Sequence, residues 1–323
     1  MAFNSRPVRA ITDEDRAAYA RDGAVCLRNV FDRDWIDSLL PIARRLLVDG
    51  EDFGLLPHVP GSWMARKIPE FREFAFRSPI GEAAGRALGS QWVRFFVDIF
   101  FAKPPRSTAA TPWHSDRSGW PFSGTMIPSF WMPLTPVSRA NGLEVIAGSH
   151  RQDLYYWNIT AMSKKMIRPP DRLNIPDAET VRGDPNYTFL GWDMEPGDAL
   201  LIHPWALHYS SGNSTDDWRI ALTVRLLGDD TRWDPRPECV GLAGVSLDEM
   251  VPGEVPDTPF LPVIWSADGR TDPMETYPTG FATRWSASAR PRLKAERAKA
   301  PTYMDEVKRF GGQSSMKDVE RVS

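Results

Sequence analysis

The chain has 323 residues, of which 42% are hydrophobic and 25% are charged, and its formal net charge at pH 7 is −3. This composition is that of an ordinary globular protein with enough apolar residues for a large core. The small net charge gives no electrostatic footprint for nucleic acid or an anionic membrane. Two cysteines that lie far apart, Cys26 and Cys239, exclude a disulfide framework and a cysteine-rich zinc site.

The N-terminal residues 1–12 include basic side chains but no apolar segment of the kind that secretory signals contain. No apolar run approaches the length of a membrane span. We therefore expect a cytoplasmic protein that partners with neither membrane nor nucleic acid.

The chain opens with helical patterns. A capping box at Thr12 predicts a helix that ends at Gly23, and a short strand should follow over residues 24–30. A longer amphipathic helix is expected after Asp32, and Pro41 should kink it.

Residues 50–75 are rich in proline and aromatic residues and are predicted to be irregular. They would either cover the mouth of an active site or form a packed Ω-loop. Ser78 and Pro79 then predict a further helix that ends near Gly89. Residues 1–90 are thus expected to form the helical front of one domain that spans the whole chain.

From Trp92 onward the pattern changes to short apolar runs separated by proline and glycine, and residues 91–228 are predicted to be a β-core. An irregular insertion is expected over residues 157–187. The proline-rich residues 229–323 favour an extended arm over a second core. This arm would pack on its own barrel or on a partner subunit, so an oligomer is possible, and residues 292–299 are expected to form a charged surface helix.

The first candidate ligands for a metal are His114 and Asp116, in the sequence Thr-Pro-Trp-His-Ser-Asp. Alternate residues of a strand point to one face, so both side chains can reach a single metal ion. A His-x-Asp pair alone is weak evidence, because such pairs are also common on solvated loops. Two histidines and one carboxylate with open coordination positions would form the facial triad of non-haem Fe(II) oxygenases.

A strand is predicted to begin at Arg219, where Ile220, Leu222, Val224 and Leu226 alternate with less apolar residues. Inside a barrel, the guanidinium of Arg219 needs an anionic partner, because an unpaired buried charge is very costly. Guanidinium binds carboxylate through two parallel hydrogen bonds, so a dicarboxylate cosubstrate is one candidate partner. A structural Arg–Asp pair is the alternative.

The motifs along the chain resemble those of a known family. They are, in order, His-x-Asp, the turn Gly148-Ser149-His150, the segment Pro196-Gly197-Asp198, and His208-x-Ser210 with Arg219 eleven residues after His208. In this order and spacing, roughly residues 10–230 resemble the phytanoyl-CoA dioxygenase family of Fe(II)/2-oxoglutarate-dependent oxygenases. The individual motifs are moderately specific, and their combination is strongly specific.

The resemblance implies a mainly β fold with flanking helices around a double-stranded β-helix, a jelly-roll of the cupin type. It implies that Fe(II) is bound and that a small-molecule C–H bond is oxidised, most often by hydroxylation, with release of succinate and CO2. The implied metal ligands are His114, Asp116 and His208. The residues implied to bind the cosubstrate 2-oxoglutarate are Arg219, Ser210, Trp120 and Ser129, the last three by comparison with relatives such as ectoine hydroxylase.

His203 competes with His208 as the third ligand. On one strand these two side chains would point to opposite faces, so both cannot bind the metal without a bulge. The His-x-Ser motif and the spacing to Arg219 favour His208. We expect His203 to support the site or to lie in the core and His150 to be structural, and no role is assigned to His58.

Arg117 and Lys103 are candidates for contact with the substrate. The resemblance implies that the insertion at residues 157–187 shapes the substrate pocket. Halogenating relatives carry glycine or alanine where Asp116 stands, so an aspartate favours hydroxylation, desaturation or ring chemistry. Two rival interpretations remain open, a non-catalytic cupin-like binding protein and a zinc hydrolase that uses the same three ligands. The nearest candidate for the general base of such a hydrolase is Glu144.

Overall fold

The computed structural model describes residues 3–49, 61–152, 156–157, 173–174, 176–236, 250–279 and 314–315. Most of the predicted insertion at residues 157–187, the predicted helix at residues 292–299 and His58 therefore lie outside the described residues. Among the residues that are described, no helix combines the length and the apolar character that crossing a membrane requires.

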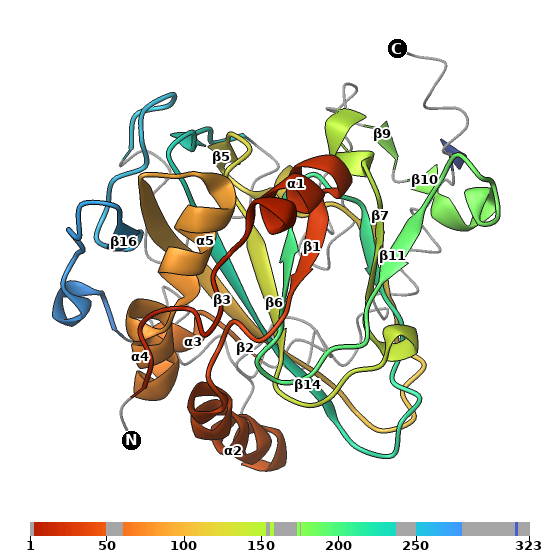
Figure 1. The fold of residues 1–323 in the computed structure, drawn as a ribbon, viewed down its shortest axis with the longest axis horizontal. Coiled ribbons are helices and arrows are strands. Elements are labelled where there is room, and N and C mark those ends of the chain that lie inside the picture. The colour runs from red at the N-terminus through yellow and green to blue at the C-terminus, as the bar shows by residue number, and fades with distance from the viewer. Residues whose placement is uncertain are drawn as a thin grey trace, which may run out of the picture.

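Five α-helices lie within the described N-terminal residues 3–49 and 61–90, and Figure 1 shows their arrangement. They are α1 (Asp13–Asp22), α2 (Arg33–Asp49), α3 (Met64–Lys67), α4 (Pro69–Arg77) and α5 (Ile80–Leu88). The expected capping box is present, because the Thr12 side chain accepts from the backbone N–H of Asp15 while the Asp15 carboxylate accepts from that of Thr12. Helix α2 continues through Pro41. The prediction that residues 50–75 are irregular was wrong where they are described, since α3 and most of α4 lie there.

The strands fall into one large sheet, one smaller sheet and three short pairs. The large sheet runs in the order β1 (Ala24–Leu27), β12 (Ala199–Ile202), β6 (Ser129–Pro133), β14 (Arg219–Leu227), β3 (Trp92–Lys103) and β16 (Val263–Ser266), with β2 (Gly61–Ser62) also paired to β3. The smaller sheet runs β11 (Phe189–Gly191), β7 (Leu143–Ile146), β13 (His208–Ser210) and β4 (Thr111–His114). The short pairs are β15 (Arg232–Trp233) with β5 (Phe122–Ser123), β8 (Tyr156–Trp157) with β9 (Leu173–Asn174), and β10 (Pro176–Asp177) with β17 (Ser314–Ser315).

Helices α2 to α5 cover the outer face of the large sheet, away from β7 and β11 (Figure 1). The predicted alternation in β14 explains why, because Ile220, Leu222, Val224 and Leu226 all pack into the cluster that also holds the apolar helix residues. These four side chains are almost completely buried. The apolar stripe of β14 is therefore the surface on which the helical layer rests.

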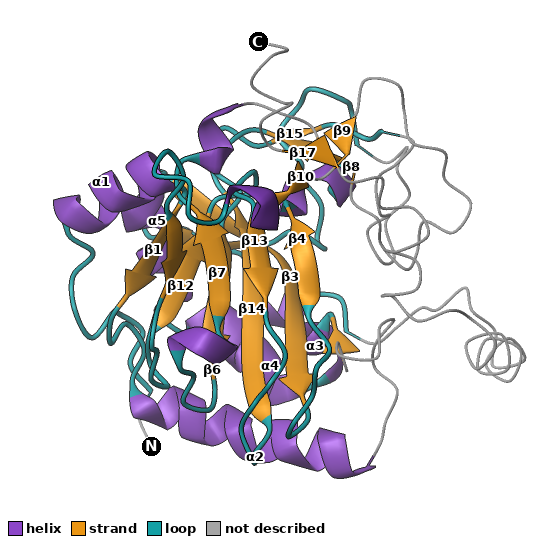
Figure 2. Ribbon diagram, turned by 90° about the vertical axis from the view of Figure 1, so that its right-hand side faces the viewer, coloured by secondary structure: helices purple, strands orange, loops and turns teal. Residues whose placement is uncertain are grey.

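The other face of β14 looks toward the smaller sheet, which Figure 2 shows alongside the large one. All strand pairs within these two sheets are antiparallel. Strand β14 lies between β3 and β6, so Arg219 is the direct partner of Lys103 and Arg225 that of Ser129. Polar side chains at both ends of β14 thus enter the space between the sheets.

Part of the C-terminal arm packs on the barrel. Strand β16 extends the large sheet by pairing antiparallel with β3. Trp233, Met250 and Leu261 are buried in one cluster with Phe96 and Phe122. The described part of the arm is therefore a component of this fold.

Gly23 lies where α1, β1 and the turn before His150 meet. Its φ of +77° is in the left-handed region, and its N–H caps α1 by donating to the Tyr19 carbonyl. A Cβ atom here would approach the His150 Nδ1 to 2.4 Å. The position therefore requires glycine for both its conformation and its close contact.

Candidate metal centre

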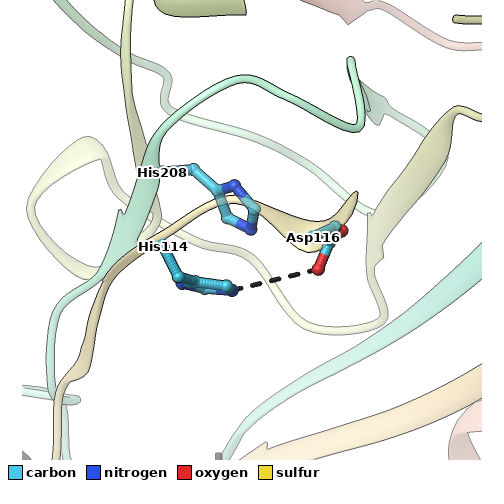
Figure 3. Close-up of side chains that lie close together, drawn as sticks. All are labelled: His114, Asp116 and His208. Atoms are coloured by element: carbon cyan, nitrogen blue, oxygen red, sulfur yellow. Dashed lines mark ion pairs between the residues drawn. The ribbon is translucent and has the colours of Figure 1, made fainter. Parts of the chain in front are cut away.

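Three side chains that lie apart in the sequence converge between the sheets. His114 ends β4, Asp116 begins the following 3-10 turn (Asp116–Gly119), and His208 begins β13. His114 and His208 are direct partners across the antiparallel pair, and their ring centroids are 4.1 Å apart. One candidate ligand atom from each of the three residues lies within 4.8 Å of those from the other two. Figure 3 shows the three groups turned toward one another.

The orientation of each imidazole is fixed by the backbone carbonyl two residues before it in the chain. The Nδ1 of His114 is 2.8 Å from the Pro112 carbonyl, and that of His208 is 3.0 Å from the Ala206 carbonyl. A carbonyl can only accept, so each Nδ1 carries the proton and each Nε2 keeps a free lone pair. Such a hydrogen bond on the far nitrogen is typical of histidines that bind metals.

The ionisation states also suit a divalent metal. Burial, together with the adjacent ring of His208, lowers the pKa of His114 to about 3. Burial opposes ionisation of Asp116, but Arg225 and the two imidazoles outweigh it, so its pKa is lowered to about 2. A neutral imidazole and an ionised carboxylate are the forms that coordinate metals. With a nitrogen, nitrogen and oxygen donor set, the residues fit a facial triad.

Asp116 is held by two side chains from the large sheet. The Ser129 hydroxyl donates to its Oδ2 at 2.8 Å, and the Arg225 Nη2 donates to its Oδ1 at 2.8 Å. Trp120 lies beneath Arg225, whose guanidinium carbon is 4.8 Å from the centre of the ring. The predicted residues Ser129 and Trp120 are therefore next to the acid of the triad and to Arg225.

A second polar group forms around Ser210. Arg219 donates through its Nη2 to the Ser210 Oγ at 2.9 Å and through its Nη1 to the Asn141 carbonyl. The Lys103 Nζ lies 3.3 Å from the same hydroxyl and 3.1 Å from the Ser210 carbonyl, and it also contacts the Ser211 carbonyl. Ser210 therefore joins two cationic side chains that come from β14 and β3.

These two basic side chains are buried without a carboxylate partner among the described residues. Arg219 is 6% exposed and Lys103 is 2% exposed. Within the part of the chain that the structure describes, neither forms an ion pair with a carboxylate, and the Arg219 Nε has no hydrogen-bond partner. Burial lowers the pKa of Arg219 to about 10 and, together with the charge of Arg219, that of Lys103 to about 6. The structural Arg–Asp pair that the sequence left open is absent from these residues.

The other two histidines that the structure describes, His150 and His203, lie outside the triad. His203 follows β12 rather than sharing a strand with His208, and its Nδ1 accepts from the Trp205 N–H at 3.3 Å. Its ring lies 4.7 Å from that of His150, whose Nε2 is 3.1 Å from the Ala20 carbonyl. Burial lowers the pKa of His150, and burial together with the neighbouring His150 ring lowers the pKa of His203 to about 3. Both histidines are thus neutral core residues.

The turn after His203 supports the site through its backbone. The Pro204 carbonyl accepts from the Arg117 N–H at 3.0 Å, immediately after Asp116. The guanidinium carbon of Arg117 lies 5.2 Å from the Trp205 ring centre, and Arg117 is 3% exposed. Arg117 is therefore buried beside the triad.

Glu144 does not face the triad. It is the cross-strand partner of Tyr209, which alternates with His208 along β13. Its carboxylate forms an ion pair with Arg182 at 2.7 Å. Trp113 stacks on Tyr209 at 5.4 Å, so it too lies on this outer face rather than beside the ligands. The described structure thus offers no free carboxylate at Glu144 to serve as a hydrolytic base.

Arg225 and Lys103 are the residues near the site whose contacts the sequence analysis did not anticipate. Alternation places Arg225 on the same face of β14 as Arg219, so its inward direction was readable. The sequence did not predict that Arg225 contacts Asp116, because that contact depends on how the turn after β4 folds over β6.

Comparison with known proteins agrees with this geometry. The sequence model of the phytanoyl-CoA dioxygenase family matches residues 19–221, which is more than half of the chain. The chain belongs to the phytanoyl-CoA dioxygenase family. This membership confirms the family and the enzyme class expected from the sequence, a 2-oxoglutarate-dependent non-haem iron dioxygenase.

Two relatives of this family member illustrate the range of similarity. The peroxisomal phytanoyl-CoA dioxygenase of Mus musculus is 24% identical over 265 residues, which cover 74% of this chain and 73% of the mouse protein. A probable phytanoyl-CoA dioxygenase of Caenorhabditis elegans is 29% identical over 133 residues. That match spans 40% of each protein, so the chain aligns with less than half of the worm protein's length.

Two solved structures share the fold of this dioxygenase. The epimerase SnoN in complex with Fe3+, alpha ketoglutarate and nogalamycin RO superposes with a TM-score of 0.62 at 21% identity, covering 78% of this chain and 98% of that one. EctD from S. alaskensis with 2-oxoglutarate and 5-hydroxyectoine gives a TM-score of 0.57 at 20% identity, covering 74% and 88%. The predicted fold class, a jelly-roll of the cupin type with flanking helices, is confirmed.

Proposed function

We propose that His114, Asp116 and His208 hold Fe(II), and that the protein uses 2-oxoglutarate to hydroxylate a C–H bond of a small molecule. The observation that carries this proposal is the pairing of a facial triad with two buried basic side chains, Arg219 and Lys103, that have no carboxylate partner among the described residues. A triad alone would suit several metals, and a basic pocket alone would suit many anions. Their combination between two sheets suits a metal-chelating dicarboxylate.

The roles of the residues follow from their positions. The free Nε2 atoms of the histidines and the Asp116 carboxylate would bind the metal on one side only. Arg219, Ser210 and Lys103 would bind the distal carboxylate of 2-oxoglutarate. Bound iron and 2-oxoglutarate supply the oxidising chemistry, in which O2 is consumed and succinate and CO2 are released. Asp116 occupies the position that halogenating relatives leave open, which argues against halogenation and is consistent with hydroxylation, desaturation or ring chemistry.

The surroundings of the site would keep bulk water from the reacting groups. Trp120 and Phe122 pack edge-on against Phe96 in a buried cluster beside the triad. Trp131 is buried in the cluster between the two sheets, together with Val145. Apolar walls of this kind protect a reactive centre from side reactions.

The proposal is tested by anaerobic titration of the metal-loaded protein. Fe(II) and 2-oxoglutarate together should give a weak visible charge-transfer band, and His114→Ala should abolish it. Under air, substrate should stimulate the release of succinate from 2-oxoglutarate. Absence of the band in wild-type protein that has been shown to hold iron would contradict the proposal. Hydrolytic activity with Zn(II) in place of Fe(II) would favour a hydrolase instead.

We further expect 2-oxoglutarate binding to be coupled to proton uptake by Lys103. Because burial lowers the pKa of this ammonium to about 6, Lys103 is mostly neutral in the free protein at pH 7.5. A bound dianion favours the charged form and raises the pKa. The affinity should therefore fall as the pH rises above 6, by at most about tenfold per pH unit.

Isothermal titration in two buffers of different ionisation enthalpy measures this uptake directly. Lys103→Met should remove the proton uptake and flatten the pH dependence, since methionine fills similar space without titrating. An affinity of the wild-type protein that is constant between pH 6.5 and 8.5 would show that Lys103 does not contact the ligand.

We propose a reducing cytoplasm, which suits an Fe(II) enzyme, although the mouse relative is named as peroxisomal. Fluorescence imaging of the tagged protein separates the two locations. An oligomer formed through the rest of the C-terminal arm would be detected by light scattering before and after removal of residues 280–323.

A further inference from the structure

Arg225 holds the acid of the triad from the opposite sheet. Its Nη2 is 2.8 Å from the Asp116 Oδ1, and its Nε is 3.4 Å from the Ser129 hydroxyl, which itself donates to the other oxygen of Asp116. The side chain of Arg225 is 14% exposed and that of Asp116 is 8% exposed. Both oxygens of the carboxylate are thus fixed by side chains of the large sheet.

The guanidinium itself is also fixed in place. It lies over the face of Trp120, whose ring packs edge-on against Phe96. The strand register also fixes the position of Arg225 along β14, because Arg225 is the direct partner of Ser129 on β6. A side chain with this many constraints cannot swing away from Asp116 at little cost.

The same oxygen has a second neighbour. The Asp116 Oδ1 that accepts from Arg225 is also 4.0 Å from the His114 Nε2, so it is the oxygen on the metal side of the carboxylate. Asp116 carries the only negative charge of the triad. The positive charge of Arg225 balances it, and Arg219 adds a further buried positive charge between the sheets.

We propose that Arg225 is a positioning residue that fixes Asp116 and also weakens metal binding until 2-oxoglutarate arrives. This inference rests on the proposed function. A guanidinium near a divalent cation repels it, most strongly where water is excluded. The dianion restores the charge balance, so metal and cosubstrate should each strengthen the binding of the other, beyond their direct contact.

The test measures Mn(II) binding by titration with and without 2-oxoglutarate. In Arg225→Gln, Mn(II) alone should bind about tenfold more tightly than in the wild type, because the opposing charge is gone. Mn(II) affinity in the presence of 2-oxoglutarate should change little, so the factor by which 2-oxoglutarate strengthens Mn(II) binding should fall by about the same amount. Arg225→Lys keeps the charge, so its Mn(II) affinity should stay within about threefold of the wild type.

Arg94→Gln is the matched control. Arg94 is a buried arginine on the neighbouring strand β3 and pairs with Asp257 rather than with the triad. Its replacement should cost stability and leave Mn(II) affinity and coupling unchanged. Thermal unfolding of every variant shows whether it is folded.

Two outcomes would overturn the inference. One is equal or weaker binding of Mn(II) alone in Arg225→Gln, since a residue that only positions Asp116 would weaken binding when lost. The other is a tenfold gain in Arg225→Lys, which applies even if the glutamine variant does not fold. Two other results would contradict the proposed metal centre on which this inference rests. They are a wild type that binds no Mn(II), and a His114→Ala variant that binds Mn(II) as well as the wild type does.

Discussion

Arg219→Met should lower the affinity for 2-oxoglutarate by a factor on the order of 100, because a buried charge-assisted contact with the distal carboxylate is lost. The ligand-free protein should respond differently. Arg219 is buried without a carboxylate partner among the described residues, so its removal relieves a desolvation cost. The free energy of unfolding without ligand should stay within about 1 kcal/mol of the wild type or rise.

Equilibrium unfolding with and without 2-oxoglutarate checks both parts of this prediction. At a concentration about 100 times the dissociation constant, the ligand should stabilise the wild type by about 2.7 kcal/mol and should hardly affect the variant. Arg94→Met is the reference, because Arg94 has a carboxylate partner in Asp257 and its loss should destabilise the protein. A large loss of stability in ligand-free Arg219→Met, with ligand affinity intact, would assign Arg219 a structural role.

Asp116→Ala should abolish metal binding and also destabilise the fold. One ligand of three is lost, and the Arg225 guanidinium is left buried without its carboxylate. Breaking a buried ion pair in this way typically costs about 3 kcal/mol or more. We therefore expect loss of iron and of succinate release together with a lower unfolding midpoint in urea.

The double variant Asp116→Ala/Arg225→Met separates the two effects. It removes the uncompensated charge, so most of the stability should return while metal content stays at background. If the double variant were as unstable as Asp116→Ala, the buried charge could not be the cause. If it bound iron at the wild-type level, Asp116 would not be a ligand.

The sequence was most informative where its pattern is periodic. The alternation from Ile220 to Leu226 correctly assigned the outer face of β14, and the capping box at Thr12 correctly began α1. The helices α3 and α4 were missed although Phe71, Phe74 and Ala75 have helical spacing, because the proline and aromatic content suggested a loop. Short helices carry few repeats, so composition outweighed their period.

The site was predictable from motifs, and its supporting contacts were not. Family motifs identified His114, Asp116, His208 and Arg219, which the structure brings between two sheets. The contact of Lys103 with Ser210 depends on how β3 of one sheet lies against β13 of the other. Such contacts between sheets follow from packing, which no local pattern encodes.

The facing positions of His114 and His208 on antiparallel strands also bear on how the chain reaches its native form. Trp113 and Tyr209 alternate with these ligands and stack outside, under Phe189. Because side chains change sides at every residue, a slip by one position would turn the aromatic rings inward and the imidazoles outward. A misaligned pair of β4 and β13 would thus be unable to bind iron, so metal uptake during synthesis or refolding would report, and select, correctly aligned molecules.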